Sequence, residues 1–167
     1  MVDAPPSCTP ETVDLLDNGN LDDGVPPWVE SSSGDFDIIL NEGDLDRAME
    51  ALGKVGFIYR HSANVSMFLD GPDAKARDAV HVVFAGKKVR AEYPEPVPDI
   101  EDYELIENAR TLPLEALVRM KLASFRRKDQ VHLLDMISIG MIDNTWPKKF
   151  SPDLQLRLQE LLNDPDG

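Results

Sequence analysis

Cysteine is nearly absent from this sequence, because Cys8 is the only one among 167 residues. A single thiol excludes an internal disulfide framework and any metal site built from several cysteines. The three histidines, His61, His81 and His132, are too scattered along the chain to suggest zinc ligands. The sequence therefore predicts neither a disulfide-stabilised fold nor a zinc site.

Long apolar runs are missing as well. No stretch approaches the roughly 18 consecutive apolar residues that a membrane helix requires. The opening segment, residues 1–10, has neither the basic start nor the apolar stretch of a secretory or transit peptide. We therefore expect a soluble, cytoplasmic protein with no membrane partner, and its apolar share of 42% is that of an ordinary globular chain with one core.

Basic residues are absent from the first 46 positions, which contain twelve acidic ones. The whole chain has 31 acidic and 17 basic residues and a formal net charge of −14, so the remainder holds 19 acids against 17 bases. The acidity thus belongs mostly to one end. The rest of the protein repels a phosphate backbone only weakly, and a local basic patch on it can still bind phosphate.

Residues 1–33 are rich in breakers of regular structure, among them Pro5-Pro6, Asn18-Gly19 and Pro26-Pro27. A short helix over residues 11–16 would not persist without packing. Such a segment has too little apolar area to offset the entropy of ordering it. We therefore predict an acidic, largely disordered tail over residues 1–33 and a folded domain over residues 34–163.

Strands and helices follow one another in a clear order in the predicted domain. An apolar, β-favouring run predicts a strand over residues 35–40, and a helix capped by Asp44 and stopped by Gly56 follows it. Further strands are expected at residues 57–61, 65–69 and 80–84, a proline-rich connector at 90–98, and helices at 114–125, 128–139 and 152–162. This order predicts an α+β fold, with a small mixed β-sheet, flanking helices and a C-terminal helical part.

Two residues near the last helices have expected structural roles. Trp146 lies between the last two helices and is expected to anchor them. Ser151, directly before the helix that begins with Pro152, is expected to be its N-cap. Both expectations concern packing rather than chemistry.

Asp35 and Asp37 are separated by one residue on a predicted strand, so both carboxylates point to the same face. Two carboxylates on one face can hold Mg²⁺ while nucleotide phosphates and water complete its coordination. In a chain this acidic, the same pair also fits a solvated strand entry. The spacing alone leaves both readings open.

Lys121 falls in the middle of the apolar stripe of the helix predicted at residues 114–125. Its stem can pack on the core while its ammonium reaches the surface. Alternatively, the ammonium faces a cleft, where it binds a phosphate or pairs with a catalytic carboxylate. Helical pattern alone does not separate the two.

The next predicted helix adds two acidic candidates and a basic corner. Asp129 stands where a capping or first-turn acid is favoured. Asp135 shares a face with apolar residues, so we expect it to be partly buried and available to Lys121 or to a substrate. The basic corner consists of Arg126, Arg127 and Lys128, and a second basic run contains Lys87, Lys88 and Arg90. The corner is either a solvated surface or, together with the second run, a guide for a polyphosphate or RNA.

Three segments together carry a resemblance: GDFDIIL at residues 34–40, ALGKVGF at 51–57 and LEALVRMKLASFRRKD at 114–129. Over residues 34–142 the chain resembles the nucleotidyltransferase-like family that includes AbiEii-type toxins. The resemblance implies a nucleotidyltransferase fold, an NTP as donor, and an antitoxin-like protein as a partner. It also implies Mg²⁺ or Mn²⁺ held by Asp35 and Asp37. Lys121 and Asp135 are then catalytic, and Lys121, Arg126 and Lys128 bind the nucleotide.

Two positions depart from the family pattern. Gly24-Val25 stands where such proteins have a Gly-Ser pair that begins a phosphate-binding helix, and His81 stands where a third carboxylate is expected. Three functions therefore stay open. The first is Mg²⁺-dependent transfer of a nucleotide to a hydroxyl on RNA, protein or a small molecule. The second is a nucleotide- or protein-binding module without turnover. The third is an interaction protein whose acidic tail masks a basic surface.

Overall fold

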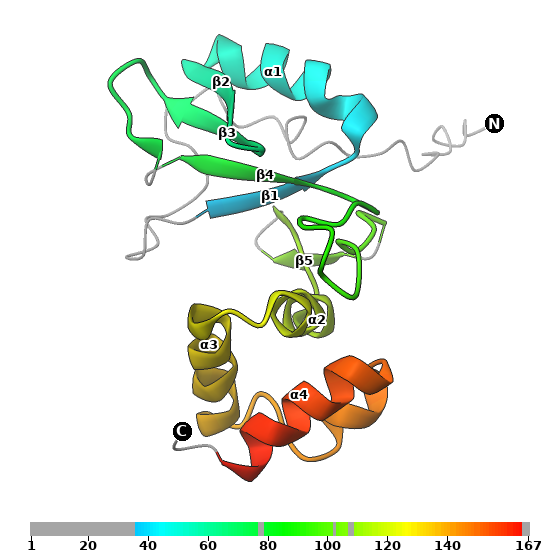
Figure 1. Ribbon diagram of the computed structural model, residues 1–167. Coiled ribbons are helices and arrows are strands. Elements are labelled where there is room, and N and C mark those ends of the chain that lie inside the picture. The colour runs from blue at the N-terminus through cyan, green and yellow to red at the C-terminus, as the bar shows by residue number, and fades with distance from the viewer. Residues whose placement is uncertain (1–35, 77–78, 102, 107–108, 165–167) are drawn as a thin grey trace, which may run out of the picture. The chain divides into compact units, whose positions relative to one another are not determined.

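A computed structural model describes residues 36–76, 79–101, 103–106 and 109–164 (Figure 1). Within these residues the chain divides into two compact units. The sheet unit contains residues 36–37, 43–82 and 105–110, and the helical unit contains residues 38–42, 83–104 and 111–164, apart from the gaps just given. The tail predicted at residues 1–33 lies outside the described residues.

The first described elements form where the sequence predicts them. β1 (Phe36–Leu40) is followed by a single 3₁₀ turn, η2 (Glu42–Asp44), and by the helix α1 (Leu45–Lys54). Ala48 and Leu52 lie one turn apart on α1, and both are buried. The helical spacing of apolar residues in the sequence therefore identifies the buried face of α1 correctly.

The two ends of α1 differ in how well the sequence predicts them. Gly56 adopts a φ of 97°, so it supplies the left-handed residue that closes the helix. The prediction that the Asp44 side chain caps the helix is wrong. Asp44 occupies the N-cap position in a helical conformation without a side-chain cap bond, and its carboxylate lies 3.6 Å from the Arg47 guanidinium. Capping normally needs a non-helical N-cap residue, and the preceding 3₁₀ turn removes it.

A mixed four-stranded sheet has the strand order β1-β4-β3-β2. β2 (Phe57–Ser62) pairs antiparallel with β3 (Val65–Asp70), and β3 pairs antiparallel with β4 (Val80–Phe84). The β2–β3 connection has two residues, Ala63 and Asn64, with φ values of 51° and 61°. Two successive left-handed residues are typical of a type I′ turn, whose twist matches that of a hairpin.

The register of the sheet decides which side chains share a face. Arg60 pairs with Met67, and Met67 pairs with His81, so the three lie in one row across the sheet. Met67 and the next residue, Phe68, point to opposite faces, and they are only 5% and 0% exposed. β3 is therefore covered on both of its faces.

A two-stranded sheet formed by β5 (Glu104–Ile106) and β6 (Ala109–Thr111) is not predicted from the sequence. Leu105 and Ile106 are 66% and 53% exposed, so β5 has no buried face. Sequence patterns detect strands through alternation between buried and exposed positions, and this strand has none. The proline-rich connector predicted at residues 90–98 is confirmed, because no helix or strand forms there.

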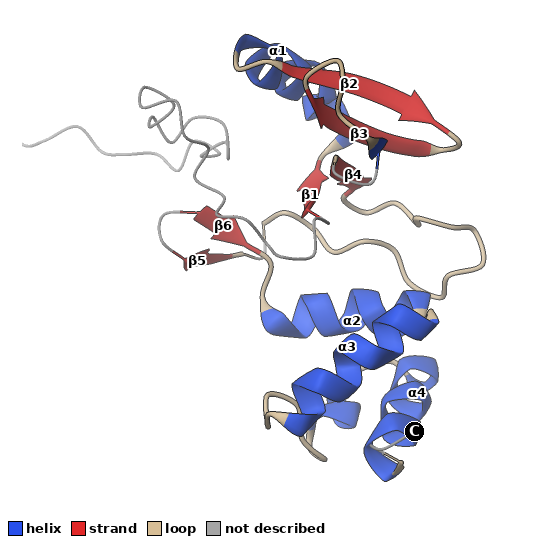
Figure 2. Ribbon diagram, turned by 90° about the vertical axis from the view of Figure 1, so that its left-hand side faces the viewer, coloured by secondary structure: helices blue, strands red, loops and turns tan. Residues whose placement is uncertain are grey.

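Three helices build the helical unit, and they pack against one another (Figure 2). They are α2 (Leu114–Ser124), α3 (Arg127–Ser138) and α4 (Pro152–Asn163), and a 3₁₀ turn, η4 (Trp146–Lys149), precedes α4. The predicted helices agree with them to within one residue at each end.

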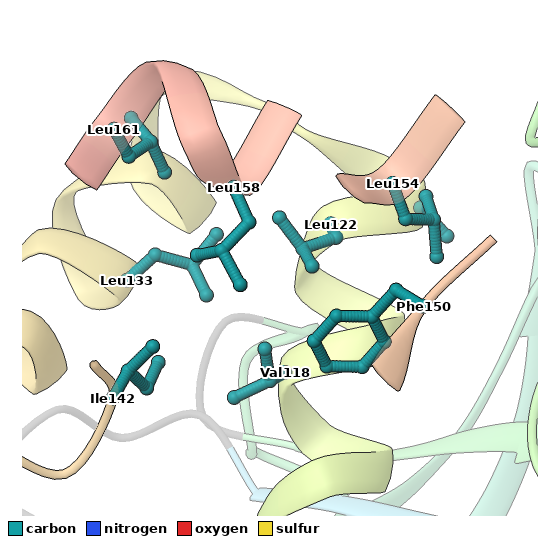
Figure 3. Packing of buried hydrophobic residues seen from close by; sticks show 9 residues of the cluster. Val118, Leu122, Leu133, Ile142, Phe150, Leu154, Leu158 and Leu161 are labelled. Carbon is teal, nitrogen blue, oxygen red and sulfur yellow. The ribbon is translucent and has the colours of Figure 1, made fainter. Parts of the chain in front are cut away.

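One hydrophobic core holds these helices together (Figure 3). Its members come from all three helices and from the α3–α4 connection, and they are Val118, Leu122, Ala123, Leu133, Ile142, Phe150, Leu154, Leu158 and Leu161. Each fully buried leucine contributes about 1.5 to 3 kcal/mol through removal of apolar surface from water. The core therefore fixes the relative positions of the helices that carry the basic corner.

The α3–α4 connection shows one confirmed expectation and one correction. Trp146 is half-buried against the helical core, as predicted for an anchor, and the Lys149 ammonium lies 4.2 Å from the centre of its ring. Ser151 is the N-cap residue of α4, but its side chain makes no capping hydrogen bond and its hydroxyl donates to Glu95 instead. This long-range bond uses the hydroxyl as a donor, whereas capping would use its oxygen as an acceptor.

Among the described residues, the helices are all too short or too polar to cross a membrane. The observed elements confirm an α+β protein with a small mixed sheet and a C-terminal helical part.

Candidate functional site

Asp37 on β1 and His81 on β4 lie on neighbouring strands of the sheet. Asp37 Oδ1 is 3.8 Å from His81 Nδ1, and the two side chains are 65% and 26% exposed. This separation is too long for a hydrogen bond. A carboxylate oxygen and an imidazole nitrogen therefore face each other at a position that solvent and ligands can reach.

This pair can share a divalent cation. With metal–ligand bonds of about 2.1 Å, two ligands of one ion lie roughly 3 to 4 Å apart, and the Asp37–His81 separation falls in that range. Mg²⁺ prefers oxygen ligands, so the imidazole favours a transition-metal ion such as Mn²⁺. No group of three or more metal-ligating side chains occurs in the part of the chain that the structure describes. A nucleotide would bring further ligands through its phosphate oxygens.

The metal site predicted from the sequence consists of Asp35 and Asp37. Asp35 lies outside the described residues, so its part in the site stays a prediction. His81 stands where the resemblance implies a third carboxylate, and the structure puts it next to Asp37. The residue beside Asp37 therefore occupies the position that the resemblance indicates, but it has an imidazole instead of a carboxylate.

The Lys121 ammonium contacts a specific partner that is not predicted from the sequence. Its helix neighbours Val118 and Leu122 are fully buried, and its Nζ lies 2.9 Å from Nδ1 of His132 on α3. Because an ammonium can only donate, the imidazole accepts at Nδ1 and carries its proton at Nε2. The stem of Lys121 leaves the apolar stripe, and its charged end is held at the α2–α3 surface.

The expectation that Asp135 is partly buried is wrong, since its side chain is exposed. The buried residues of α3 are Asp129 and Leu133, one turn apart. Asp135 follows Leu133 by two residues and so lies on the opposite side of the helix. Val131, one turn before Asp135 on α3, is 54% exposed. The solvent-facing side of α3 thus carries Asp135, and its catalytic role stays a prediction.

Asp129 organises the corner between α2 and α3. The residue is 3% exposed, and its side chain accepts hydrogen bonds from the Ser124 hydroxyl at 2.7 Å and from the Arg126 backbone N–H at 3.1 Å. The Arg126 guanidinium adds two more, from Nε at 2.7 Å and Nη2 at 3.2 Å. Asp129 therefore caps α3 as predicted, because it satisfies a backbone donor that the helix leaves unpaired.

The pKa of Asp129 lies below its ordinary value of 3.8. Burial is the largest single influence and raises the pKa of this carboxyl. Hydrogen bonds from Arg126 and Ser124, together with the positive charge of Arg126, lower the pKa by more than burial raises it. The charged form of Asp129 is consequently the one that fits the corner.

Two further side chains hold the end of α2. Arg157 on α4 donates from Nη1 to the carbonyl oxygens of Leu122 at 2.6 Å and Ala123 at 3.0 Å. Gln130 donates to the carbonyl of Phe125, the left-handed residue that ends α2 with a φ of 47°. These bonds satisfy carbonyl groups that a helix terminus leaves without partners. No local pattern around Arg157 indicates this role, because its targets belong to another helix.

The predicted nucleotide-binding residues Arg126 and Lys128 differ in their surroundings. Arg126 is bound to Asp129, so its guanidinium helps to build the corner. Lys128 is exposed in the first turn of α3, four residues before His132. Their binding of a nucleotide stays a prediction.

The basic run before the connector is partly paired. Lys87 Nζ lies 3.0 Å from Glu42, and Arg90 lies 3.8 Å from Glu92. Both pairs are exposed, so each contributes little to stability. Nothing in these contacts adds to the evidence for a polyphosphate guide.

The predicted site residues fall into two groups. Asp37 belongs to the sheet unit with His81, whereas Lys121, Arg126, Lys128 and Asp135 belong to the helical unit. Comparisons of the chain with protein-family models, with curated proteins and with solved structures find no match. Function must therefore be inferred from the two groups of residues themselves.

Proposed function

We propose that the protein binds an NTP together with a divalent cation and transfers the nucleoside monophosphate to a hydroxyl acceptor, with pyrophosphate as the leaving group, on a nucleotidyltransferase-like fold. The proposal depends on one observation, the 3.8 Å juxtaposition of Asp37 and His81 on neighbouring strands. Asp37, the second aspartate of the Asp-x-Asp segment, thus lies next to His81, which occupies the position where the resemblance implies a further metal ligand. The α+β architecture is compatible with that fold.

In this function Asp37 and His81 would hold the cation, and Asp35 stays the further ligand that the resemblance implies. The cation would supply charge neutralisation at the phosphates during transfer. Two described protein ligands bind a free ion weakly. We therefore expect tight cation binding only when a nucleotide contributes phosphate oxygens.

A second function is favoured by the imidazole itself. His81 contributes no negative charge where a carboxylate would, so the pair is a weaker ligand for Mg²⁺ than two carboxylates. Such a site can bind a nucleotide as its metal complex without turning it over. Under the first function, the proposed acceptors are RNA and a protein hydroxyl, and the proposed partner is an antitoxin-like protein.

Calorimetry with Mn²⁺ and a non-hydrolysable ATP analogue tests the shared part of both functions. Asp37→Asn and His81→Phe should each weaken Mn²⁺ binding in the presence of the analogue by at least about tenfold, the range seen when a metal site loses a supporting group. Asp46→Asn is the matched control, because Asp46 is an exposed aspartate on α1. Wild-type protein that binds no cation with the analogue, or unchanged binding by Asp37→Asn, would contradict both functions.

Transfer of label from each α-labelled NTP, with Mg²⁺ or Mn²⁺, separates the two. Label on an RNA or protein acceptor, lost in Asp37→Asn, supports a nucleotidyltransferase. Cation-dependent nucleotide binding without any transfer supports the binding module instead.

A further inference from the structure

The strand β5 presents apolar side chains on both of its faces. Leu105 and Ile106 are consecutive strand residues, so they point to opposite faces, and they are 66% and 53% exposed. The corresponding pair on β3, Met67 and Phe68, is almost completely buried. A strand in the interior of a sheet is thus covered on both sides in this protein, whereas β5 is covered on neither.

The outer edge of β5 is also open. Among the residues that the structure describes, β6 is the only strand beside β5 (Figure 2). The other edge of β5 therefore carries backbone N–H and C=O groups that face no further strand. A sheet of two strands is at best marginally stable in water, and a third strand stabilises it. A strand added at this edge would pair with the backbone of β5 and cover its apolar side chains.

Charge indicates what kind of strand fits this edge. Residues 91–118 contain eight acidic residues and a single basic one, Arg110. Three of the acidic residues near β5, Asp99, Glu101 and Glu104, are exposed. Opposite charges on neighbouring strands stabilise their pairing, and like charges destabilise it. The edge therefore favours a strand that has basic residues.

The same charge argues against two occupants that this chain itself could supply. Residues 1–35 contain eight acidic residues and no basic one. A second copy of the chain would bring an equally acidic β5 to the edge. Either pairing would place acidic residues beside acidic residues. The occupant is therefore a different polypeptide.

We propose that the outer edge of β5 binds an extended segment of a partner protein in which apolar and basic residues alternate. Leu105 lies on one face of β5, and Glu104 and Ile106 lie on the other. The apolar residues of the added strand would pack beside Leu105, and its basic residues would lie beside Glu104. This interaction requires neither an NTP nor a cation, so it is independent of the proposed function.

The test is binding of a short synthetic peptide of alternating valine and lysine to the full-length protein. A peptide of alternating valine and glutamate is the comparison, and we expect calorimetry to detect binding of the first peptide only. Leu105→Ser should weaken binding of the valine–lysine peptide by about tenfold, because it removes the apolar contact on one face. Glu104→Lys should weaken it by about fivefold, because it replaces an attraction with a repulsion.

Two matched controls come from α4. Leu156 is 70% exposed, so Leu156→Ser removes an apolar side chain from the surface without touching β5. Glu160 is exposed, and Glu160→Lys changes the net charge of the protein as much as Glu104→Lys does. Both controls should bind the valine–lysine peptide as the wild type does. Because all four substituted residues are exposed, thermal melts should show that the variants remain folded.

Hydrogen exchange locates the bound peptide. Amides of β5 should exchange more slowly when the peptide is present, and those of β2, the edge strand of the four-stranded sheet, should not change. Slower exchange in β2 instead of β5 would overturn the proposal. Slow exchange in β5 without peptide would also overturn it. In that case an increase with protein concentration would identify a second copy, and no dependence on concentration would identify the chain itself as the occupant.

The affinities decide the remaining alternatives. Absence of any binding of the valine–lysine peptide to the wild type would overturn the proposal. Unchanged affinity in both Leu105→Ser and Glu104→Lys would overturn it as well, because the peptide would then be attracted only by the overall negative charge of the chain. Equal binding of the valine–glutamate peptide would contradict the preference for a basic partner.

Discussion

Asp129 combines deep burial with a full set of hydrogen-bond donors, and its charge is part of the fold. Asp129→Asn replaces one carboxylate oxygen with an amide group, which faces hydrogen-bond donors but cannot accept from them. The substitution also removes the negative charge that pairs with Arg126. We expect a loss of about 1.5 to 3 kcal/mol in the free energy of unfolding at neutral pH. Urea unfolding followed by circular dichroism measures it, and Asp135→Asn, at an exposed position of the same helix, should change it by less than about 0.5 kcal/mol.

This contribution should depend on pH in one direction. The folded-state pKa of Asp129 lies below the ordinary value of 3.8, so the folded protein holds the charged form more strongly than the unfolded chain does. The stabilisation is therefore fully present above the unfolded pKa and is lost as the pH falls through the lower, folded pKa. The difference between wild type and Asp129→Asn should narrow below about pH 4. A difference that stays constant down to acid pH would contradict this account.

At the scale of single elements, the β2–β3 turn contains an avoidable strain. Ala63 adopts a φ of 51°, a left-handed conformation that costs a residue with a Cβ about 1 kcal/mol. Asn tolerates this conformation and is favoured at the first position of a type I′ turn. Ala63→Asn should therefore raise the free energy of unfolding by about 0.5 to 1 kcal/mol, measured by urea unfolding.

A control distinguishes turn geometry from a general effect of asparagine. Ala51 lies within α1, where Asn is a poorer helix former than Ala by a few tenths of a kcal/mol. Ala51→Asn should thus lower stability while Ala63→Asn raises it. Changes of the same sign at both positions would show that the turn conformation is not the cause.

At the scale of the whole molecule, two compact units have separate clusters of buried residues. Leu133 is fully buried in the core of the helical unit, and Leu69 is fully buried in a cluster with Met67 and Ala79 in the sheet unit. Leu133→Ala should cost the helical unit about 2 to 5 kcal/mol. If the units open independently, hydrogen exchange should accelerate in α2–α4 and stay unchanged in β2 and β3.

Leu69→Ala should give the opposite pattern, with faster exchange in β2 and β3 and unchanged exchange in α2–α4. Equal acceleration in both units by either substitution would mean that the chain unfolds as one cooperative unit. Together, the two variants therefore show whether the two structural units also unfold independently of each other.

Sequence alone determines most of the elements. Helices at residues 114–125, 128–139 and 152–162 and strands at 57–61, 65–69 and 80–84 follow from apolar spacing, breakers and turn residues, which act within a few residues of one another. The same local signals fail where an element buries no face, as in β5, or where a side chain has a distant partner, as Ser151 has in Glu95.

Tertiary structure alone decides the two contacts that candidate site residues make. Asp37 meets His81 because β1 and β4 are neighbours in the sheet, and Lys121 meets His132 because α2 and α3 pack against each other. The spacing of residues within one element does not encode either arrangement. Residue spacing also placed Asp135 on the wrong side of α3, because only the packed core defines which face of a helix is buried.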